Sequence, residues 1–352
     1  MLCGYAFNGE DIVEQGSYLL MRGINITEGS IRHSSELDRY YSGSIEKLDK
    51  YKLAVGDLVI GMDGSKVGRN SAIVSSYEDG SYLVQRVCRI KSSIGNNYIL
   101  QFINNTKFHQ YVDTVKTSSA IPHISLRDIQ NYRISIPPTQ NETDKIAKLF
   151  LLIDERIATQ NKIIEKYESL IRGIRNESFR KLRRNVGFNA MIGDVLGYEQ
   201  PQSYIVEDTE YTDEGTPVLT ANKAFVLGYT SETAGIYDKG DCIIFDDFTL
   251  DCKYVDFPFK VKSSAIKILT AENKELLRYT FEFLKYLDLS TDEHKRHYIA
   301  ETQNQEFILP TTQIVRTISH AFSVLSLRME TVVKQRLLFE KQKQYLLRQM
   351  FI

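Results

Sequence analysis

The sequence predicts an internally duplicated protein of the mixed α/β class, with strand-rich globular domains and two long helices packed as an antiparallel coiled coil. Three features of the 352-residue chain predict this fold. One segment occurs twice, each copy ends in an apolar heptad pattern, and short β-branched and aromatic runs lie between turn residues. Two copies of one plan also predict pseudo-twofold symmetry.

The repeat is clearest where each copy leaves its globular part. Residues 131–140 read NYRISIPPTQ and residues 304–313 read NQEFILPTTQ, so that Asn, Pro, Thr and Gln coincide. Upstream, VGDLVI at 55–60 parallels KGDCII at 239–244. The repeat predicts four segments, which are a first domain at 1–139, a first helix at 140–184, a second domain at 185–312 and a second helix at 313–352.

Local patterns predict the elements of the globular domains. Short apolar runs bounded by Gly, Asp and Ser predict strands at 58–61, 82–90 and 243–245. Helical spacing of apolar residues predicts a helix over 272–286. Because proline cannot donate to a sheet, Pro137, Pro138 and Pro310 are expected to mark the end of the strand before each long helix.

The two long helices carry matching apolar seams. In the first, positions 146, 150, 153, 157, 160, 164, 167, 171, 174 and 178 follow heptad spacing, and the second repeats them 172 residues later, with eight of ten apolar in each. Such seams favour pairing of the two helices over the alternative that each folds back on its own domain. At ~1.5 Å per residue, ~40 residues make a spacer of about 60 Å. The residues predicted to form the interface are Ile153, Ile157, Ile164, Tyr167, Leu325, Met329, Phe339 and Leu346.

Composition excludes several classes of protein. No stretch approaches ~18 uninterrupted apolar residues and no N-terminal signal pattern is present, so a cytoplasmic protein without a membrane span is expected. Four cysteines without CxxC spacing make a disulfide framework or a zinc site an unfavoured interpretation. Charge is segregated, because 185–312 holds 22 acidic against 11 basic residues while both helices are basic.

Catalytic signatures are missing from the sequence. There is no Gly-rich phosphate loop ending in Gly-Lys-Ser/Thr and no Asn-Pro-Pro-aromatic motif of a DNA adenine methyltransferase. Asp246, Asp247, Asp251 and Lys253 could hold Mg²⁺ in a nuclease, but their spacing is cramped and a turn is the favoured interpretation. His294 and His297 lack a nearby third metal ligand. The sequence therefore predicts no enzyme and no metal site.

The order of several strings resembles the specificity subunit of type I restriction-modification systems. These strings are GYAF at 4–7, RGINI at 22–26, VLTA at 218–221, DDFT at 246–249 and FKVKSSA at 259–265, together with the strand-Pro-helix segments. The resemblance covers essentially the whole chain. It implies a DNA-recognition subunit whose two domains each read one half of a split double-stranded DNA site.

The resemblance also implies the partners of the chain. The helices set the spacing between the half-sites and dock two methyltransferase subunits, while restriction subunits complete the complex. S-adenosylmethionine, ATP and Mg²⁺ are then expected on those partners, and this chain binds no cofactor. Because the two domains differ outside the repeated segments, an asymmetric bipartite target is expected. The alternatives are a specificity module of another restriction enzyme class and a repeat-built adaptor that binds protein.

Polar and basic residues in loop-like surroundings are the predicted DNA contacts. Arg or Lys reads guanine and Asn or Gln reads adenine, while other basic groups hold phosphates. The predicted contacts are Arg22, Asn25, Lys66, Arg69, Lys116, His123, Arg127, Asn222, Lys223, Lys253, Lys260, Lys262, Lys295, Arg296 and His297. Since the second domain is strongly acidic, the chain alone is expected to bind DNA poorly.

Overall fold

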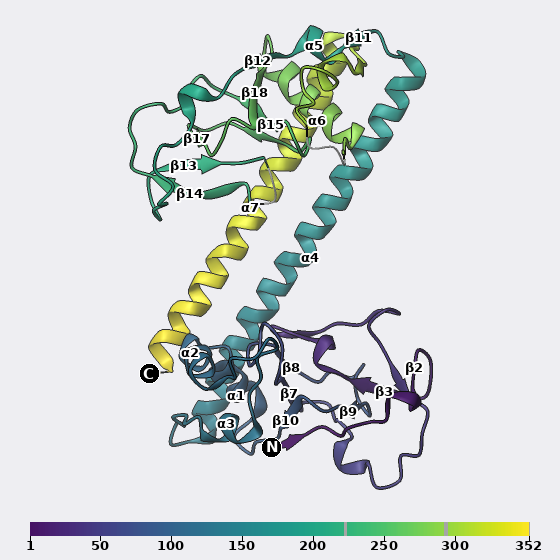
Figure 1. The fold of residues 1–352 in the computed structure, drawn as a ribbon, viewed down its shortest axis with the longest axis vertical. Coiled ribbons are helices and arrows are strands. Elements are labelled where there is room, and N and C mark those ends of the chain that lie inside the picture. The colour runs from purple at the N-terminus through teal and green to yellow at the C-terminus, as the bar shows by residue number, and fades with distance from the viewer. Residues whose placement is uncertain (222–223, 292–294, 352) are drawn as a thin grey trace. The chain divides into compact units, whose positions relative to one another are not determined.

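The computed structural model describes residues 1–221, 224–291 and 295–351. It divides into two compact units, and each contains one globular domain with part of both long helices (Figure 1). The first unit comprises 1–160 and the chain from 335 onward, and the second comprises 161–334.

The first domain is built on a four-stranded antiparallel sheet. Its order is β1 (Leu2–Cys3), β10 (Val87–Ile90), β7 (Leu58–Gly61) and β8 (Ser71–Ile73). Three helices, α1 (Asn96–Ile103), α2 (Thr106–Val115) and α3 (Leu126–Asn131), contribute to the core on this sheet. Leu58 and Ile60 point into that core, whereas Val59 points into a second cluster, so both faces of β7 are buried.

Short strands complete the first domain. A second sheet has the order β2 (Ile12–Val13), β6 (Tyr40–Tyr41), β3 (Tyr18–Met21) and β9 (Tyr82–Leu83), and β4 (Ile26–Thr27) pairs with β5 (Ser30–Ile31). Single 3₁₀ turns lie at Gly9–Asp11, Gly23–Asn25 and Asp49–Tyr51. The expected strand over 82–90 is therefore wrong as one element. It is broken between β9 and β10, where Arg86 adopts a left-handed φ of 69° that a strand cannot accommodate.

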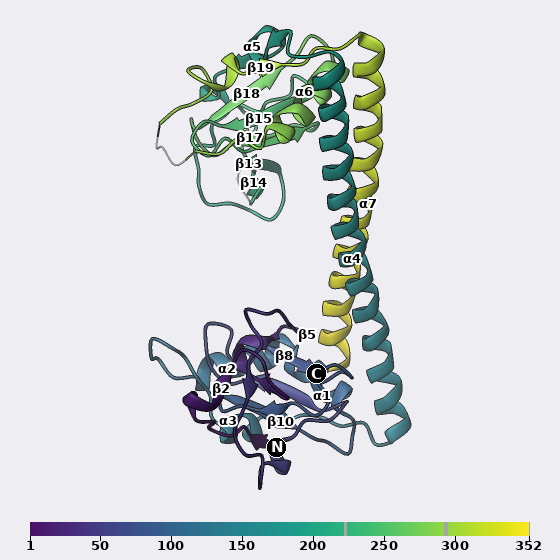
Figure 2. The same cartoon turned by 90° about the vertical axis from the view of Figure 1, so that its right-hand side faces the viewer.

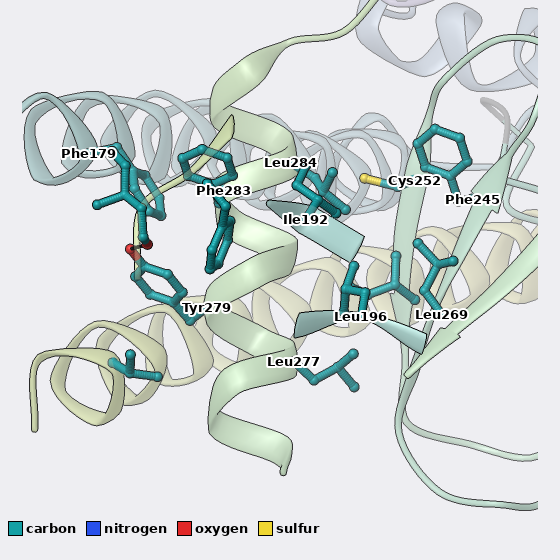
Figure 3. Close-up of a cluster of buried hydrophobic side chains, with 14 of the residues drawn as sticks. Phe179, Ile192, Leu196, Phe245, Cys252, Leu269, Leu277, Tyr279, Phe283 and Leu284 are labelled. Atoms are coloured by element: carbon teal, nitrogen blue, oxygen red, sulfur yellow. Dashed lines mark hydrogen bonds between the residues drawn. The ribbon is translucent and has the colours of Figure 1, made fainter. Parts of the chain in front are cut away.

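The second domain repeats the main sheet. Its order is β12 (Gly197–Glu199), β18 (Ile266–Thr270), β15 (Cys242–Asp246) and β16 (Cys252–Val255), again antiparallel throughout. Helix α6 (Lys274–Leu287), expected over 272–286, packs on it beside α5 (Ile192–Val195). Figure 3 shows Phe179 of the first long helix against Tyr279 and Phe283 of α6, with ring centroids 5.3 and 5.4 Å apart.

Smaller sheets surround this core. One has the order β14 (Val226–Thr230), β13 (Thr216–Leu219) and β17 (Lys260–Val261), and β11 (Ala190–Met191) pairs with β19 (Glu306–Phe307). Single 3₁₀ turns lie at Gln202–Tyr204 and Thr302–Asn304. The identical strand order of the two main sheets confirms the duplication predicted from the repeat.

The long helices are α4 (Gln140–Asn185) and α7 (Thr312–Met350), which run side by side within each unit (Figure 2). In the first unit Phe150 packs on Leu347 and Phe351, and Asp154 pairs with Lys343 at 2.6 Å. Because partner numbers fall as those of α4 rise, the helices are antiparallel.

The second unit shows the same helix arrangement. Arg175 lies over the ring of Phe322, with its guanidinium carbon 5.9 Å from the centroid. Farther along α4, Phe179 and Leu182 share a core with Val315. In both units the helices therefore pack on each other, and the alternative that each helix folds back on its own domain alone is wrong.

Burial follows the predicted heptad seam. All ten seam positions of α4 are buried or half-buried, and so are nine of the ten in α7, with Met350 exposed. One related expectation fails, because the stretch before Pro137 forms no described strand. Residues 126–131 are helical instead, and the following segment is extended, with Ser135 accepting a hydrogen bond from the hydroxyl of Tyr98.

Candidate nucleic-acid interface

A rigid turn follows the central strand of the second domain. Between β15 and β16, the carboxylate of Asp246 accepts hydrogen bonds from the backbone N–H groups of Phe248 and Thr249, both at 2.9 Å. Leu250 completes the turn with a left-handed φ of 61°, which β-carbon sterics disfavour. The turn presents the ring of Phe248, which is 37% exposed.

The buried carboxylate of Asp247 connects this turn to the rest of the domain. One carboxylate oxygen of Asp247 accepts from the backbone N–H groups of His297 and Tyr298 at 3.1 and 2.8 Å. Its other oxygen lies 3.5 Å from the ammonium of Lys267, which also donates to Gln200 at 2.9 Å. Because buried charges must be paired and hydrogen-bonded, these contacts fix three segments of the domain together.

An open recess lies beside the turn. Its volume is about 460 Å³, and we call it the β15–β16 recess. The residues that line it are Thr220, Ala224, Leu227, Asp246, Phe248, Thr249, Lys262, Ser263 and Ala265. Arg296 reaches the same edge of the domain, since its guanidinium donates to the hydroxyl of Ser264 at 3.4 Å. The recess thus combines an apolar ring, a lysine and hydroxyl groups.

The other predicted contacts of the second domain occupy different surroundings. Lys260 is buried, donates to the carbonyl of Ala234 and pairs with Glu232 at 2.6 Å. His297 is also buried, and its Nδ1 lies 2.9 Å from Glu301. In this conformation both side chains hold the domain together and do not face solvent.

Four further predicted contacts fall on the surface or outside the described residues. Lys253 pairs with Asp251 at 3.8 Å, and Lys295 pairs with Glu301 at 2.9 Å. Asn222 and Lys223 lie outside the described residues, as does His294.

In the first domain, Asn25 belongs to a buried polar network. Its amide donates to Asp38 at 3.0 Å and to the carbonyl of Arg32 at 3.2 Å, and it is 1% exposed. His33 connects Asp38 to Glu78, with 3.0 Å to each carboxylate. Burial raises the pKa of Glu78, but hydrogen bonds from Ser75 and His33 outweigh it and hold the pKa below its ordinary value.

The remaining predicted contacts of the first domain are basic groups at or near its surface. Arg22 is half-buried, and its guanidinium donates to the carbonyl of Leu37 at 3.5 Å. Lys66 pairs with Glu28 at 2.9 Å. Arg69 and Lys116 share Asp113, at 3.1 and 2.6 Å.

His123 and Arg127 lie near the start of α3. The backbones of His123 and Asp63 pair in an isolated antiparallel β-bridge. The Nδ1 of His123 lies 3.0 Å from the hydroxyl of Thr117. Arg127 is exposed on α3. The bridge brings the loop after β7 against the loop before α3, so that two segments far apart in sequence meet.

Sequence reasoning missed Phe248 and the Asp247–Lys267 pair. The DDFT string directly after a buried strand was the available signal, because an Asp that follows a strand often organises a turn. The acidic cluster considered for a nuclease is used within the fold, with Asp246 and Asp247 buried. Across the described parts of the chain, no group of three His, Cys, Asp or Glu could hold a metal ion.

Burial disfavours the thiolate form of the four cysteines. Burial raises the pKa of Cys88, Cys242 and Cys252 to about 12. Cys3 faces Cys88 across β1 and β10, and burial raises its pKa as well. A search of the described helices finds none that is long and apolar enough to cross a membrane.

Both long helices expose large apolar side chains. On α4, Leu149 and Leu152 are 40% and 48% exposed, and on the α7 part of the same unit Leu338 and Tyr345 are 65% and 59% exposed. In the second unit, Leu170 and Leu327 are similarly exposed. These exposed apolar side chains are candidates for contact with a partner.

Comparison with known proteins gives a consistent family. A family model described as the type I restriction modification DNA specificity domain matches residues 3–169. The chain is 46% identical over 126 residues to the type I restriction enzyme EcoR124I/EcoR124II specificity subunit of Escherichia coli. That match covers 34% of this chain and 31% of the curated relative's length.

The fold also has a solved counterpart. The crystal structure of a type I restriction-modification S subunit from M. genitalium superposes with a TM-score of 0.67. The superposition covers 100% of this chain and 93% of that one, at 15% sequence identity. At this identity the likeness shows the fold, which is the duplicated two-domain arrangement described above.

Proposed function

We propose that the chain, whose residues 3–169 match the type I restriction modification DNA specificity domain, is a sequence-specific DNA-recognition subunit of that family. Each domain reads one half of an asymmetric bipartite site in double-stranded DNA. The observation that carries the proposal is the pair of four-stranded sheets with one strand order and different residues in the loops that follow the central strands. One scaffold with two sets of loop side chains suits the reading of two different half-sites.

The long helices serve as the docking surface for two methyltransferase subunits. Leu149 and Leu152 support this role, because they stand three residues apart on α4 with 40% and 48% exposure and offer an apolar surface to a partner. In the complete complex the methyltransferase subunits bind S-adenosylmethionine, and restriction subunits bind ATP and Mg²⁺.

In this proposal the chain itself performs no chemistry. The acidic residues that most resemble a nuclease site support it, because Asp246 holds the backbone of a turn and Asp247 is paired with Lys267. Both oxygens of Asp247 are engaged in these contacts, and no third metal-ligating side chain stands beside the two carboxylates among the described residues.

The test is co-expression with the methyltransferase subunit encoded beside this gene, followed by purification and mapping of methylated bases. A stable complex that methylates a split motif is the expected result. Methylation of the same motif by the methyltransferase alone would overturn the proposal. A chain that forms no complex with the methyltransferase would favour a protein-binding adaptor instead.

A further inference from the structure

We propose that the β15–β16 recess is a base-reading site of the second domain, in which Phe248 contacts the 5-methyl group of a thymine in the major groove. Lys262 and Arg296 at the same edge bind neighbouring phosphate or guanine acceptors. The inference deepens the proposed function and rests on it. It assigns a specific base contact to a residue that carries no hydrogen-bonding group.

Phe248 stands at the tip of the turn, where it is 37% exposed and lines the recess. The turn fixes its backbone, because its own N–H group and that of Thr249 are both bonded to Asp246. Apolar side chains distinguish thymine by contact with its methyl group.

The charge around the recess includes two cations. The domain is acidic overall, yet Lys262 lines the recess and Arg296 is bonded to Ser264, between two residues that line it. Among the lining residues that the structure describes, the one carboxylate is that of Asp246, which accepts two backbone N–H groups of the turn. Local positive groups are what duplex DNA requires, since phosphate contact depends on nearby cations and not on the sum over a domain.

The first domain has the same place with different side chains. Gly61 pairs with Val87 as Asp246 pairs with Ile266, and Leu58 and Ile60 face the helix-covered core as Ile243 and Phe245 do. The structural match of the two central strands is therefore shifted by one residue from the sequence repeat of 55–60 with 239–244. Two residues after Gly61 and Asp246 stand Asp63 and Phe248.

The segments that are hydrogen-bonded to these two turns match as well. Ile124 donates its N–H to the carbonyl of Met62, and His297 donates its N–H to the carbonyl of Asp247. The residues just before them are His123 and Arg296. The pair Asp63 and His123 therefore corresponds to the pair Phe248 and Arg296, and a carboxylate that accepts from cytosine replaces a ring that contacts thymine.

The experiment removes one methyl group of the DNA at a time and measures the change in affinity. The complex of this chain with its methyltransferase is first used to map the motif. Synthetic duplexes are then made in which each thymine of the second half-site is replaced by uracil, which removes only the methyl group. The wild-type complex is expected to lose about fourfold in affinity at one position, the value of one buried methyl group.

Phe248→Ala is expected to bind thymine and uracil duplexes equally at that position. Phe257→Ala is the matched control, because Phe257 is equally exposed in the same domain but does not line the recess. It is expected to keep the fourfold preference. Melting curves of both variants exclude unfolding of the domain as the cause.

Two outcomes would overturn the inference while leaving the proposed function intact. One is a mapped split motif whose second half contains no position sensitive to the methyl group. The other is a Phe248→Ala complex that retains the preference for thymine. Failure of the wild-type complex to form or to methylate would instead refute the proposed function itself.

Discussion

Asp247 joins three segments of the second domain through one buried carboxylate. Asp247→Ala removes the acceptor of two backbone N–H groups and leaves the ammonium of Lys267, which is 1% exposed, without a charge partner. An uncompensated buried charge costs about 3–5 kcal/mol, so we expect the free energy of unfolding of this domain to fall by that order. Urea denaturation monitored by circular dichroism measures the loss.

The first domain supplies the control for this prediction. At the places of Asp247, Lys267 and Gln200 it has Met62, Cys88 and Cys3, so the same scaffold folds with an uncharged trio. The double variant Asp247→Ala with Lys267→Met should therefore recover part of the loss. A single variant as stable as the wild type would contradict the buried-pair interpretation.

Glu78 gives the first domain an acid-sensitive contact. Its folded pKa lies below the ordinary value of 4.5, because hydrogen bonds from Ser75 and His33 outweigh the effect of burial. A lowered folded pKa contributes stability above the unfolded pKa, and that stability is lost as the pH falls through the folded pKa. We expect Glu78→Gln to flatten the decline of the melting temperature between about pH 5 and pH 3. A variant that declines as steeply as the wild type would exclude this role.

At the scale of elements, the helix pair depends on its buried seam. Ile153 is 6% exposed, and Ile157, the next seam position, is half-buried. Replacing both with Asp removes about 1.5–3 kcal/mol per apolar side chain and adds the cost of buried charge. We expect a lower melting temperature and loss of methyltransferase binding, measured by differential scanning calorimetry and co-purification. An unchanged melting profile would refute the pairing.

The exposed face of α4 should behave in the opposite way. Leu149 and Leu152 lie outside the seam, so replacing both with Asp is expected to leave the melting temperature within about 1 °C, since surface changes are usually worth less than ~0.5 kcal/mol. Binding to the methyltransferase subunit should weaken about tenfold or more, as charges enter an apolar contact. Calorimetric titration of the two proteins tests this, and undiminished affinity would place the docking surface elsewhere.

The long helices could be predicted from the sequence, whereas the strand break and the burial of two polar residues could not. The seams of α4 and α7 were predictable because a heptad pattern is local and repeated along one helix. The break at Arg86 was not, because it depends on how β9 and β10 enter different sheets. The same limit applies to Asn25 and His297. Their polar side chains suit base reading, yet the fold surrounds them with buried carboxylates and backbone.

At the scale of the whole molecule, duplication is combined with divergence. The main sheets agree in order, whereas the loops beyond β7 and β15 carry different chemistry at matching positions. Charge differs as well, since the second domain has 22 acidic against 11 basic residues and the first is nearly balanced. Because nonspecific affinity arises from phosphate neutralisation, we expect the proposed DNA binding to be weak for the chain alone and to require the basic surfaces of its partners.

The divergence of the loops bears on the form of the proposed DNA target. Two domains with one scaffold and unlike loops should read two unlike half-sites separated by bases that neither domain contacts. We expect methylation mapping of the purified complex to give an asymmetric split motif with a gap of constant length. The Phe248→Ala complex should relax one position of one half-site and leave the other half unchanged. A continuous or palindromic motif would mean that the two domains do not act as separate readers, whatever their shared fold.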